Sequence, residues 1–263
     1  MDYLLVCSVA LFASALTLVS GFGLGTLLMP AFAVFFPLPA AIAATAIVHL
    51  ANNLFSLGLV ARYADRRVLI AFGIPATVAA LVGAATLRLL SEVAPLHTWK
   101  IGTHACEITT VKLVIAALII GFALLDLLPV FSRLTIGPRL LPLGGALSGF
   151  FGGLSGHQGT LRAAFLMRAG LSKETYVGMN AVCGVLVDIA RLLVYGLAYF
   201  TLSASHASRG GVSPLLVGAA CLAAFAGSFV GSRLIKKMTL ESLRIGVAVL
   251  LIVSGIALGA GLL

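Results

Sequence analysis

The chain has 263 residues, of which 61% are hydrophobic and 10% charged, and its formal net charge is +9. A soluble domain carries about 25% charged residues, so this composition excludes an ordinary water-soluble fold and predicts a polytopic membrane protein in the lipid bilayer. The basic residues lie in short loops between apolar runs. They form no stripe with interleaved aromatic residues, which argues against a nucleic-acid partner.

The first half of the chain contains five apolar segments and one glycine-rich break. The segments are 4–20, 26–36, 39–61, 69–90 and 112–131, and the break is 21–25. The residues before the first segment include Asp2 and no Lys or Arg, so we interpret residues 3–20 as a mature membrane segment and not as a signal peptide. The sequence of loop 91–111 indicates no function for it.

The second half repeats the same order of elements at low identity. Its segments are 142–154, 160–170, 173–200, 214–235 and 242–262, with a break at 155–159. Residues 25–45 align without gaps on 159–179, so that Gly25-Thr26-Leu27 falls on Gly159-Thr160-Leu161. The sequence therefore predicts an all-α fold of two inverted-topology repeats, 1–131 and 132–263, each with a re-entrant or broken hairpin and three transmembrane helices.

The two short segments are the reason for predicting hairpins. Each has 11 residues, about 16 Å as a helix, which is too short to cross a hydrocarbon core of about 30 Å. Unwound backbone at membrane depth is tolerated only where it is buried in protein or lines a cavity.

The basic residues predict an orientation. With loop 62–68 in the cytoplasm, eleven of the 17 basic residues fall on that side, four fall outside, and two lie within the membrane. The cytoplasmic set is Arg62, Arg66, Arg67, Arg133, Arg139, Arg168, Lys173, Arg233, Lys236, Lys237 and Arg244, and the outer set is Arg88, Lys100, Lys112 and Arg209. The protein is expected in the cell (inner or plasma) membrane, with both termini on its outer side.

Helices that begin in mid-membrane near Thr26 and Thr160 would present free backbone N–H groups and the positive end of the helix dipole. Two such ends facing each other predict an anion site. The candidate substrate-binding residues are Gly23, Gly25, Thr26, His49, Asn52, His157, Gln158, Gly159, Thr160 and Arg162.

Charged residues within the apolar segments are candidates for specific roles. Arg162 could bind a sulfonate, sulfite or carboxylate in bidentate fashion, with an ion pair to Asp188 or snorkelling to the cytoplasmic face as alternatives. Asp188 and Arg191 have the i, i+3 spacing of an ion pair, for which a structural role is favoured over proton coupling.

Polar residues nearby offer hydrogen bonds. His157 and Gln158 supply donors, and the histidine is also a titratable proton carrier. On the long helix of the first half, His49 can share a face with Asn52 or with Asn53, where these residues either line the site or tie helices together.

Signatures of enzymes are weak in this sequence. It has no Walker A loop and no histidine cluster with metal-ligand spacing in the membrane segments, so we expect no enzyme activity, cofactor or metal. The four cysteines, Cys7, Cys106, Cys183 and Cys221, fit neither a disulfide framework nor a metal site.

The layout resembles the sulfite exporter TauE/SafE family of bacterial membrane permeases. The matching features are Gly21-Phe22-Gly23-Leu24-Gly25-Thr26 with Pro30, the basic turn from Arg62 to Arg67, and Gly149-Phe150-Phe151-Gly152-Gly153. The resemblance implies proton-linked or passive movement of sulfite, organosulfonates or carboxylates, usually outward. Family members often carry three consecutive glycines in each hairpin. Here Leu24 interrupts the first run and the stretch from Ser155 to Arg162 replaces the second, which indicates a distinct subgroup.

The sequence thus favours a secondary transporter of a small anion, with sulfite or an organosulfonate as the expected substrate. The alternatives are an anion channel, a carrier for a small carboxylate and, with much less support, an intramembrane enzyme that uses His157 and Arg162. The sequence leaves open the anion, the direction, coupling to protons and the oligomeric state, a homodimer included.

Overall fold

The structure is a computed structural model that describes residues 2–20, 23–102, 104–127, 137–167, 169–203, 212–234 and 240–263. Several residues used in the predictions above lie outside this described part of the chain: Gly21, Phe22, Arg133, Arg168, Arg209, Lys236 and Lys237.

The helices of the first half lie close to the predicted ranges. They are α1 (Asp2–Ser20), α2 (Leu24–Ala33), α3 (Leu38–Val60), η1 (Ala61–Tyr63), α4 (Arg66–Val68), η2 (Leu69–Gly73), α5 (Ile74–Ser91) and α6 (Thr110–Leu127). The helix predicted to begin at residue 69 starts with the π-helical turn η2 before α5 continues it. Asp65 caps α4, because its carboxylate accepts hydrogen bonds from the backbone N–H groups of Arg67 and Val68 at 2.7 and 3.0 Å.

The helices of the second half follow the same order. They are η4 (Pro138–Leu140), α7 (Leu141–Ser155), α8 (Gly159–Leu166), α9 (Lys173–Ser203), α10 (Pro214–Leu234) and α11 (Leu240–Gly259). Helix α8 is shorter than the predicted segment 160–170, because it ends at Leu166 and a turn follows.

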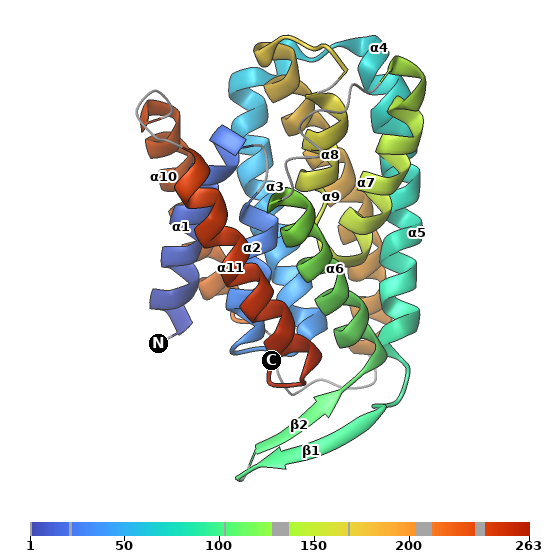
Figure 1. The fold of residues 1–263 in the computed structure, drawn as a ribbon, viewed down its shortest axis with the longest axis vertical. Coiled ribbons are helices and arrows are strands. Elements are labelled where there is room, and N and C mark those ends of the chain that lie inside the picture. Colours follow the sequence, from blue (N-terminus) through green and yellow to red (C-terminus); the bar gives the residue numbers. More distant parts are fainter. Residues whose placement is uncertain are drawn as a thin grey trace.

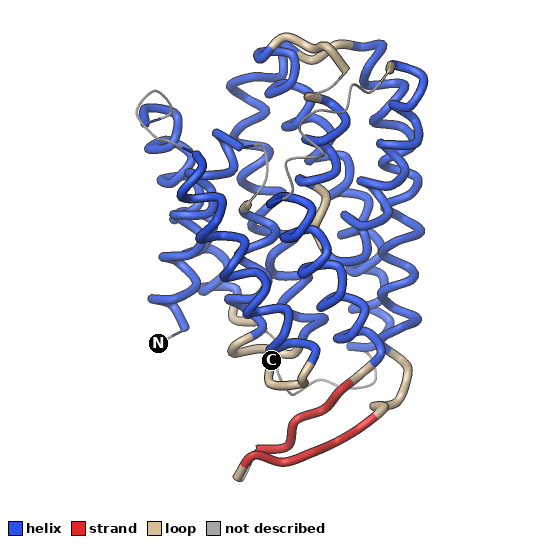
Figure 2. The backbone as a smooth tube through the Cα atoms, in the orientation of Figure 1, coloured by secondary structure: helices blue, strands red, loops and turns tan. Residues whose placement is uncertain are grey.

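Loop 91–111 contains a β-hairpin that the sequence analysis missed, so the all-α prediction needs this correction. Strands β1 (His97–Ile101) and β2 (His104–Ile108) pair antiparallel, with Trp99 opposite Cys106 (Figure 2). The indole Nε1 of Trp99 donates a hydrogen bond to the carbonyl oxygen of Ala260 at 2.9 Å. The hairpin is therefore attached to the chain just after α11.

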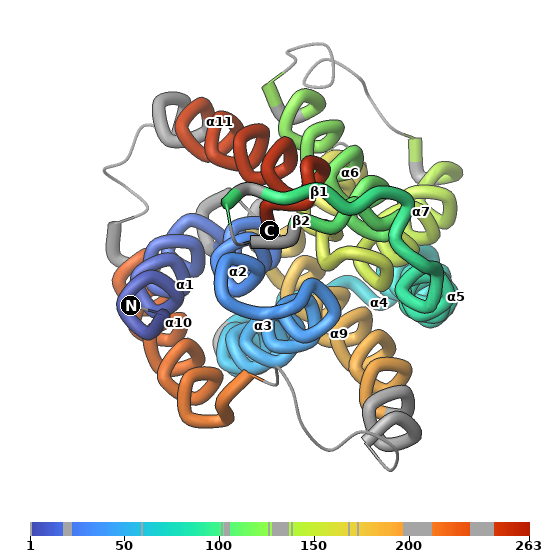
Figure 3. The backbone as a smooth tube through the Cα atoms, turned by 90° about the horizontal axis from the view of Figure 1, so that it is seen from below, coloured from blue at the N-terminus to red at the C-terminus, as the bar shows by residue number. Residues whose placement is uncertain are grey.

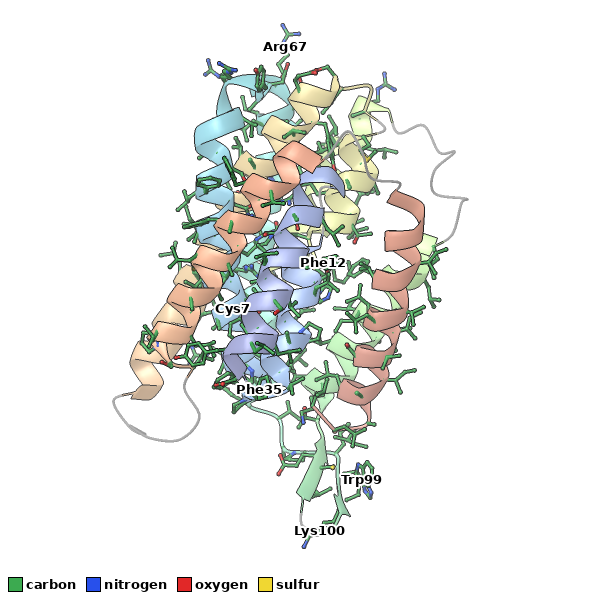
Figure 4. All side chains as sticks on the ribbon, turned by 90° about the vertical axis from the view of Figure 1, so that its left-hand side faces the viewer. Cys7, Phe12, Phe35, Arg67, Trp99 and Lys100 are labelled. Carbon is green, nitrogen blue, oxygen red and sulfur yellow. The ribbon has the colours of Figure 1, made fainter. Side chains whose placement is uncertain are left out.

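The composition of the helices fits a membrane protein. Four helical stretches of the described chain are long and apolar enough to cross a bilayer: Leu38–Gly58, Arg66–Ser91, Glu174–Gly196 and Pro214–Gly231. Large apolar side chains also cover the outside of the bundle, such as Leu4, Leu215 and Leu222, which are 78%, 73% and 69% exposed. A surface of this kind is stable in lipid and not in water. Arg67 lies at one end of the bundle, and Trp99 and Lys100 lie at the other (Figure 4).

The largest helix contacts join the two halves of the chain. Helix α1 packs on α10, α5 on α7, α6 on α11 and α3 on α9. Viewed along the bundle, α3 and α9 lie near the centre, between the α1–α10 pair and the α5–α7 pair (Figure 3). Small residues allow close contact: a Cβ on Gly149 would collide with the backbone of Ala76, and one on Gly227 with that of Leu11.

The two short helices start in the middle of the bundle and run toward opposite ends. Helix α2 extends toward the end that holds the hairpin and both termini, and α8 toward the end that holds α4 (Figure 1). The breaks that precede α2 and α8 both lie at mid-height (Figure 2).

Candidate functional site

The first break is fixed by local hydrogen bonds. Gly23 has φ 138°, a conformation that favours glycine, and it turns the chain into α2. The side-chain oxygen of Thr17, near the end of α1, accepts a hydrogen bond from the backbone N–H of Leu24 at 2.6 Å. The hydroxyl of Thr26 donates to the Gly23 carbonyl at 2.9 Å. These bonds hold the start of α2 in place, and the first of them ties it to α1.

The second break reverses the chain between α7 and α8. Gly156 ends α7 in the left-handed conformation, with φ 83°, and its N–H bonds to the Gly152 carbonyl at 2.9 Å. The hydroxyl of Ser148, within α7, donates to the carbonyl of Gln158 at 3.0 Å. Helix α8 then begins at Gly159, and helix geometry leaves its first-turn amides without intrahelical partners.

The two breaks lie side by side in the interior, as the anion-site prediction required. A Cβ added to Gly25 would lie 2.9 Å from the carbonyl oxygen of Gly156 and 3.7 Å from Nε2 of His49. Gly23, Gly25, Gly156 and Gly159 are all buried.

Asp188, on α9, is the centre of a buried polar cluster. One carboxylate oxygen accepts from Nδ1 of His49 at 2.7 Å and from Nδ2 of Asn53 at 2.8 Å. The other accepts from Nε2 of Gln158 at 3.2 Å and from Nε of Arg191 at 3.0 Å, and Nη2 of Arg191 lies 2.7 Å from it. The predicted pair Asp188–Arg191 thus exists, within a network that joins α3, the second break and α9.

Arg162 does not pair directly with Asp188, which was one predicted alternative. Its Nε donates to Oδ1 of Asn180 at 2.6 Å, and its Nη1 donates to Oε1 of Gln158 at 3.0 Å. The side chain is only 2% exposed, so it does not snorkel to the surface of the bundle. Gln158 therefore connects Arg162 to Asp188.

Three polar atoms beside the second break have no hydrogen-bond partner among the described residues: Nε2 of His157, and Nη1 and Nη2 of Arg191, of which Nη2 lies within ion-pair distance of Asp188, at 2.7 Å. A Cβ on Gly156 would lie 2.7 Å from Nη1 of Arg191, so this nitrogen lies against the break. His157 is fully buried, and its Nδ1 lies 3.1 Å from both the carbonyl oxygen and the hydroxyl of Ser155.

The cluster carries an excess of positive charge. Among the residues whose side-chain burial the structure describes, the buried side chains with a formal charge are Arg162, Asp188 and Arg191, which gives two guanidinium groups and one carboxylate. Buried charges are normally paired, since an uncompensated one is costly in a medium of low dielectric constant. The interior is therefore electrostatically suited to an anion.

The structure places the other predicted residues as follows. Asn52 faces away from Asp188, and its Oδ1 accepts a hydrogen bond from the hydroxyl of Ser228 on α10 at 2.7 Å. Asn53, which the candidate set left out, takes its place in the cluster. Thr26 is buried and Thr160 half-buried at the starts of the two short helices.

Tyr195 was also missed, although its spacing offered a signal. It follows Asp188 at an interval of two helical turns and Arg191 at an interval of one, on the same face of α9. Its hydroxyl donates to the carbonyl oxygen of Gly153, near the end of α7. This contact links the polar face of α9 to the helix that carries the second break.

Fold and site together define a polytopic membrane protein whose buried centre is positively charged and lies where two short helices begin. The chain belongs to the sulfite exporter TauE/SafE family, because the model of that family matches residues 6–258. Membership implies a membrane permease for sulfur-containing anions such as sulfite, and not an enzyme. No curated protein and no solved structure matches the chain.

Proposed function

We propose that this protein is a secondary transporter that moves sulfite or a small organosulfonate out of the cell, and that it binds the anion where the two breaks meet. The description of the family as a sulfite exporter supports the outward direction. The substrate would lie near the membrane midplane, beside Gly25 and Gly156.

The observation that carries this proposal is the unbalanced charge of the buried cluster. Arg162 and Arg191 are 2% and 0% exposed, and Asp188 is the one buried carboxylate among the residues whose side-chain burial the structure describes. A monoanion bound there would restore neutrality. Guanidinium groups suit oxyanions in particular, because their planar N–H groups match two oxygens at once.

The short helices add to this attraction. Helices α2 and α8 have 10 and 8 residues, so each is about 12–15 Å long and cannot span a bilayer alone. Their positive dipole ends start at neighbouring breaks, where they would stabilise a negative charge between them. We therefore interpret the α1–α2 and α7–α8 units as membrane-embedded hairpins.

The pattern of helix contacts supports two inverted repeats with their boundary near residue 131. The counterparts in the two halves are α1 and α7, α3 and α9, α5 and α10, and α6 and α11. Exchanging each helix for its counterpart turns the α1–α10 contact into the α7–α5 contact, and it leaves the α3–α9 and α6–α11 contacts unchanged. A pseudo-two-fold axis would generate this exchange. Because α2 and α8 run in opposite directions (Figure 1), that axis would lie in the membrane plane.

Transport by purified protein in liposomes tests the proposal. We expect sulfite flux that saturates with concentration, shows counterflow, and returns the anion chemically unchanged. Arg162→Ala should abolish the saturable flux, because it removes one of the two buried guanidinium groups. Arg88→Ala is the matched control, since Arg88 is half exposed and pairs with the exposed Glu92.

Other outcomes distinguish the alternatives. Flux that rises linearly with concentration would indicate a channel, and preferential transport of short carboxylates would move the substrate out of the sulfur class. A chemically altered product would indicate an enzyme. Wild-type flux in a folded Arg162→Ala variant would refute the role given to this residue.

A further inference from the structure

Nη1 of Arg191 and Nε2 of His157, two of the unpartnered atoms beside the second break, differ in their chemistry. Nη1 of Arg191 is a hydrogen-bond donor, and it lies against Gly156. Nε2 of His157, the next residue along the chain, also lacks a partner among the described residues. Both side chains are fully buried, so neither group is compensated by bulk water. Unsatisfied buried groups of this kind are rare in proteins and call for an explanation.

The environment of His157 fixes the proton on its ring. Nδ1 lies 3.1 Å from the carbonyl oxygen of Ser155, and a carbonyl oxygen only accepts hydrogen bonds, so Nδ1 carries the proton. In the neutral imidazole, Nε2 is then a bare acceptor. The neutral form is favoured, because the ring is fully buried and the cluster already holds one guanidinium more than it has carboxylates.

The ring is also fixed in position. The Ser155 hydroxyl lies 3.1 Å from Nδ1, and the ring of Phe122, on α6, stacks on the imidazole with the centroids 6.3 Å apart. Nε2 is therefore held in place as an acceptor on the residue that follows Gly156, and Nη1 of Arg191, a positively charged donor, lies against Gly156.

We infer that Arg191 and His157 form a subsite for a monoanion that carries one O–H group, in which Arg191 binds a charged oxygen and His157 accepts the hydrogen bond from the hydroxyl. This inference rests on the proposed function and names the protonation state of its substrate. Arg191 becomes a direct substrate contact. Arg162, whose Nε and Nη1 are engaged by Asn180 and Gln158, supplies charge from further away.

The subsite has a consequence for proton movement. Sulfite would bind as hydrogensulfite, so the proton would cross the membrane on the substrate itself. No side chain would need to gain and lose a proton in each cycle. This fits Asp188, whose two oxygens are already occupied by His49, Asn53, Gln158 and Arg191.

A matched pair of probes tests the subsite. Methylphosphonate, at a mildly acidic pH where it is a monoanion, and methanesulfonate have the same shape and the same charge, but the first carries an O–H group and the second does not. Titration calorimetry on the purified full-length protein should give a Kd about tenfold lower for methylphosphonate, as expected for one added hydrogen bond. Equal Kd values for the two probes would overturn the inference.

Two variants assign the preference to His157. His157→Phe removes the acceptor and keeps a ring to stack on Phe122, so the two Kd values should converge. His157→Gln restores an acceptor near the position of Nε2 and should recover part of the preference. An undiminished preference in the folded Phe variant would overturn the inference. Failure of sulfite and of both probes to bind the folded wild-type protein would instead refute the proposed function.

Discussion

At the scale of single residues, Asp188 is the group that holds the polar centre together. Its carboxylate accepts from side chains of α3, of the second break and of α9 itself. By binding Nε and Nη2 of Arg191, it turns the remaining nitrogen of that guanidinium toward Gly156. The orientation of the donor that we assign to the substrate therefore depends on Asp188.

Asp188→Asn should lower the free energy of unfolding by about 3–5 kcal/mol, because it leaves buried guanidinium groups without a carboxylate. Glu92→Gln is the control. It breaks the exposed pair with Arg88, whose side chains are 48% and 60% exposed, and such pairs contribute about 0–1 kcal/mol. Denaturation of both variants in the same detergent measures the difference. A loss at Asp188 no larger than that at Glu92 would show that the carboxylate is not needed for charge balance.

The sequence predicted part of this cluster. Asp188 and Arg191 were recognisable as a pair because an i, i+3 spacing brings side chains together on any helix. The choice between Asn52 and Asn53 was not predictable. Adjacent residues on a helix point about 100° apart, and only the packing of α3 between α9 and α10 decides which one faces Asp188.

At the scale of elements, the two breaks depend on the absence of side chains. Gly25→Ala should reduce sulfite flux at least tenfold, because the new Cβ would lie 2.9 Å from the Gly156 carbonyl, and backbone on both sides would have to move. Gly58→Ala is the matched control, since Gly58 lies on α3 with nothing within 4 Å of an added Cβ. Flux measured in liposomes at equal protein content compares the two variants.

The control should transport like the wild type, and its stability should rise slightly, because alanine is the better helix former. Equal flux in the two variants would mean that the close approach of the breaks is not required for transport.

Most helices were predictable because apolar runs bounded by glycine and charge identify membrane segments without knowledge of packing. The hairpin of β1 and β2 was not, since its strands have five residues each, and an alternation as short as Thr98-Trp99-Lys100-Ile101 does not distinguish a strand from a loop. The π-helical turn η2 was also missed, because no local sequence pattern distinguishes it from the α-helix that it begins.

At the scale of the whole molecule, the distribution of charge predicts how the bundle lies in the membrane. Arg67 marks one end, while the hairpin and both termini lie at the other (Figures 1 and 4). We expect the arginine end in the cytoplasm. Alkaline phosphatase fused after Leu263 should therefore be active in bacterial cells, since this enzyme folds only outside the cytoplasm. The same enzyme inserted in the loop at Ala64 should be inactive, and the reverse pattern of activities would contradict this orientation.

The association of the two halves could not be read from the sequence. A self-alignment of low identity suggests two repeats, but it does not say that the first helix of one half packs on the fourth helix of the other, as α1 does on α10. That pairing depends on small residues whose contacts lie far away along the chain, such as Gly227 with Leu11 and Gly149 with Ala76.

The hairpin limits which movements the bundle can make. It connects α5 to α6, and Trp99 binds the carbonyl of Ala260 just beyond α11, so α6 and α11 are fastened at one end. Two helices that are joined at one end can separate only at the other end. We therefore expect the α6–α11 pair to act as a pivot at the end of the bundle that holds the hairpin. Any separation of α6 from α11 would then be greatest at the opposite end, which holds Arg67.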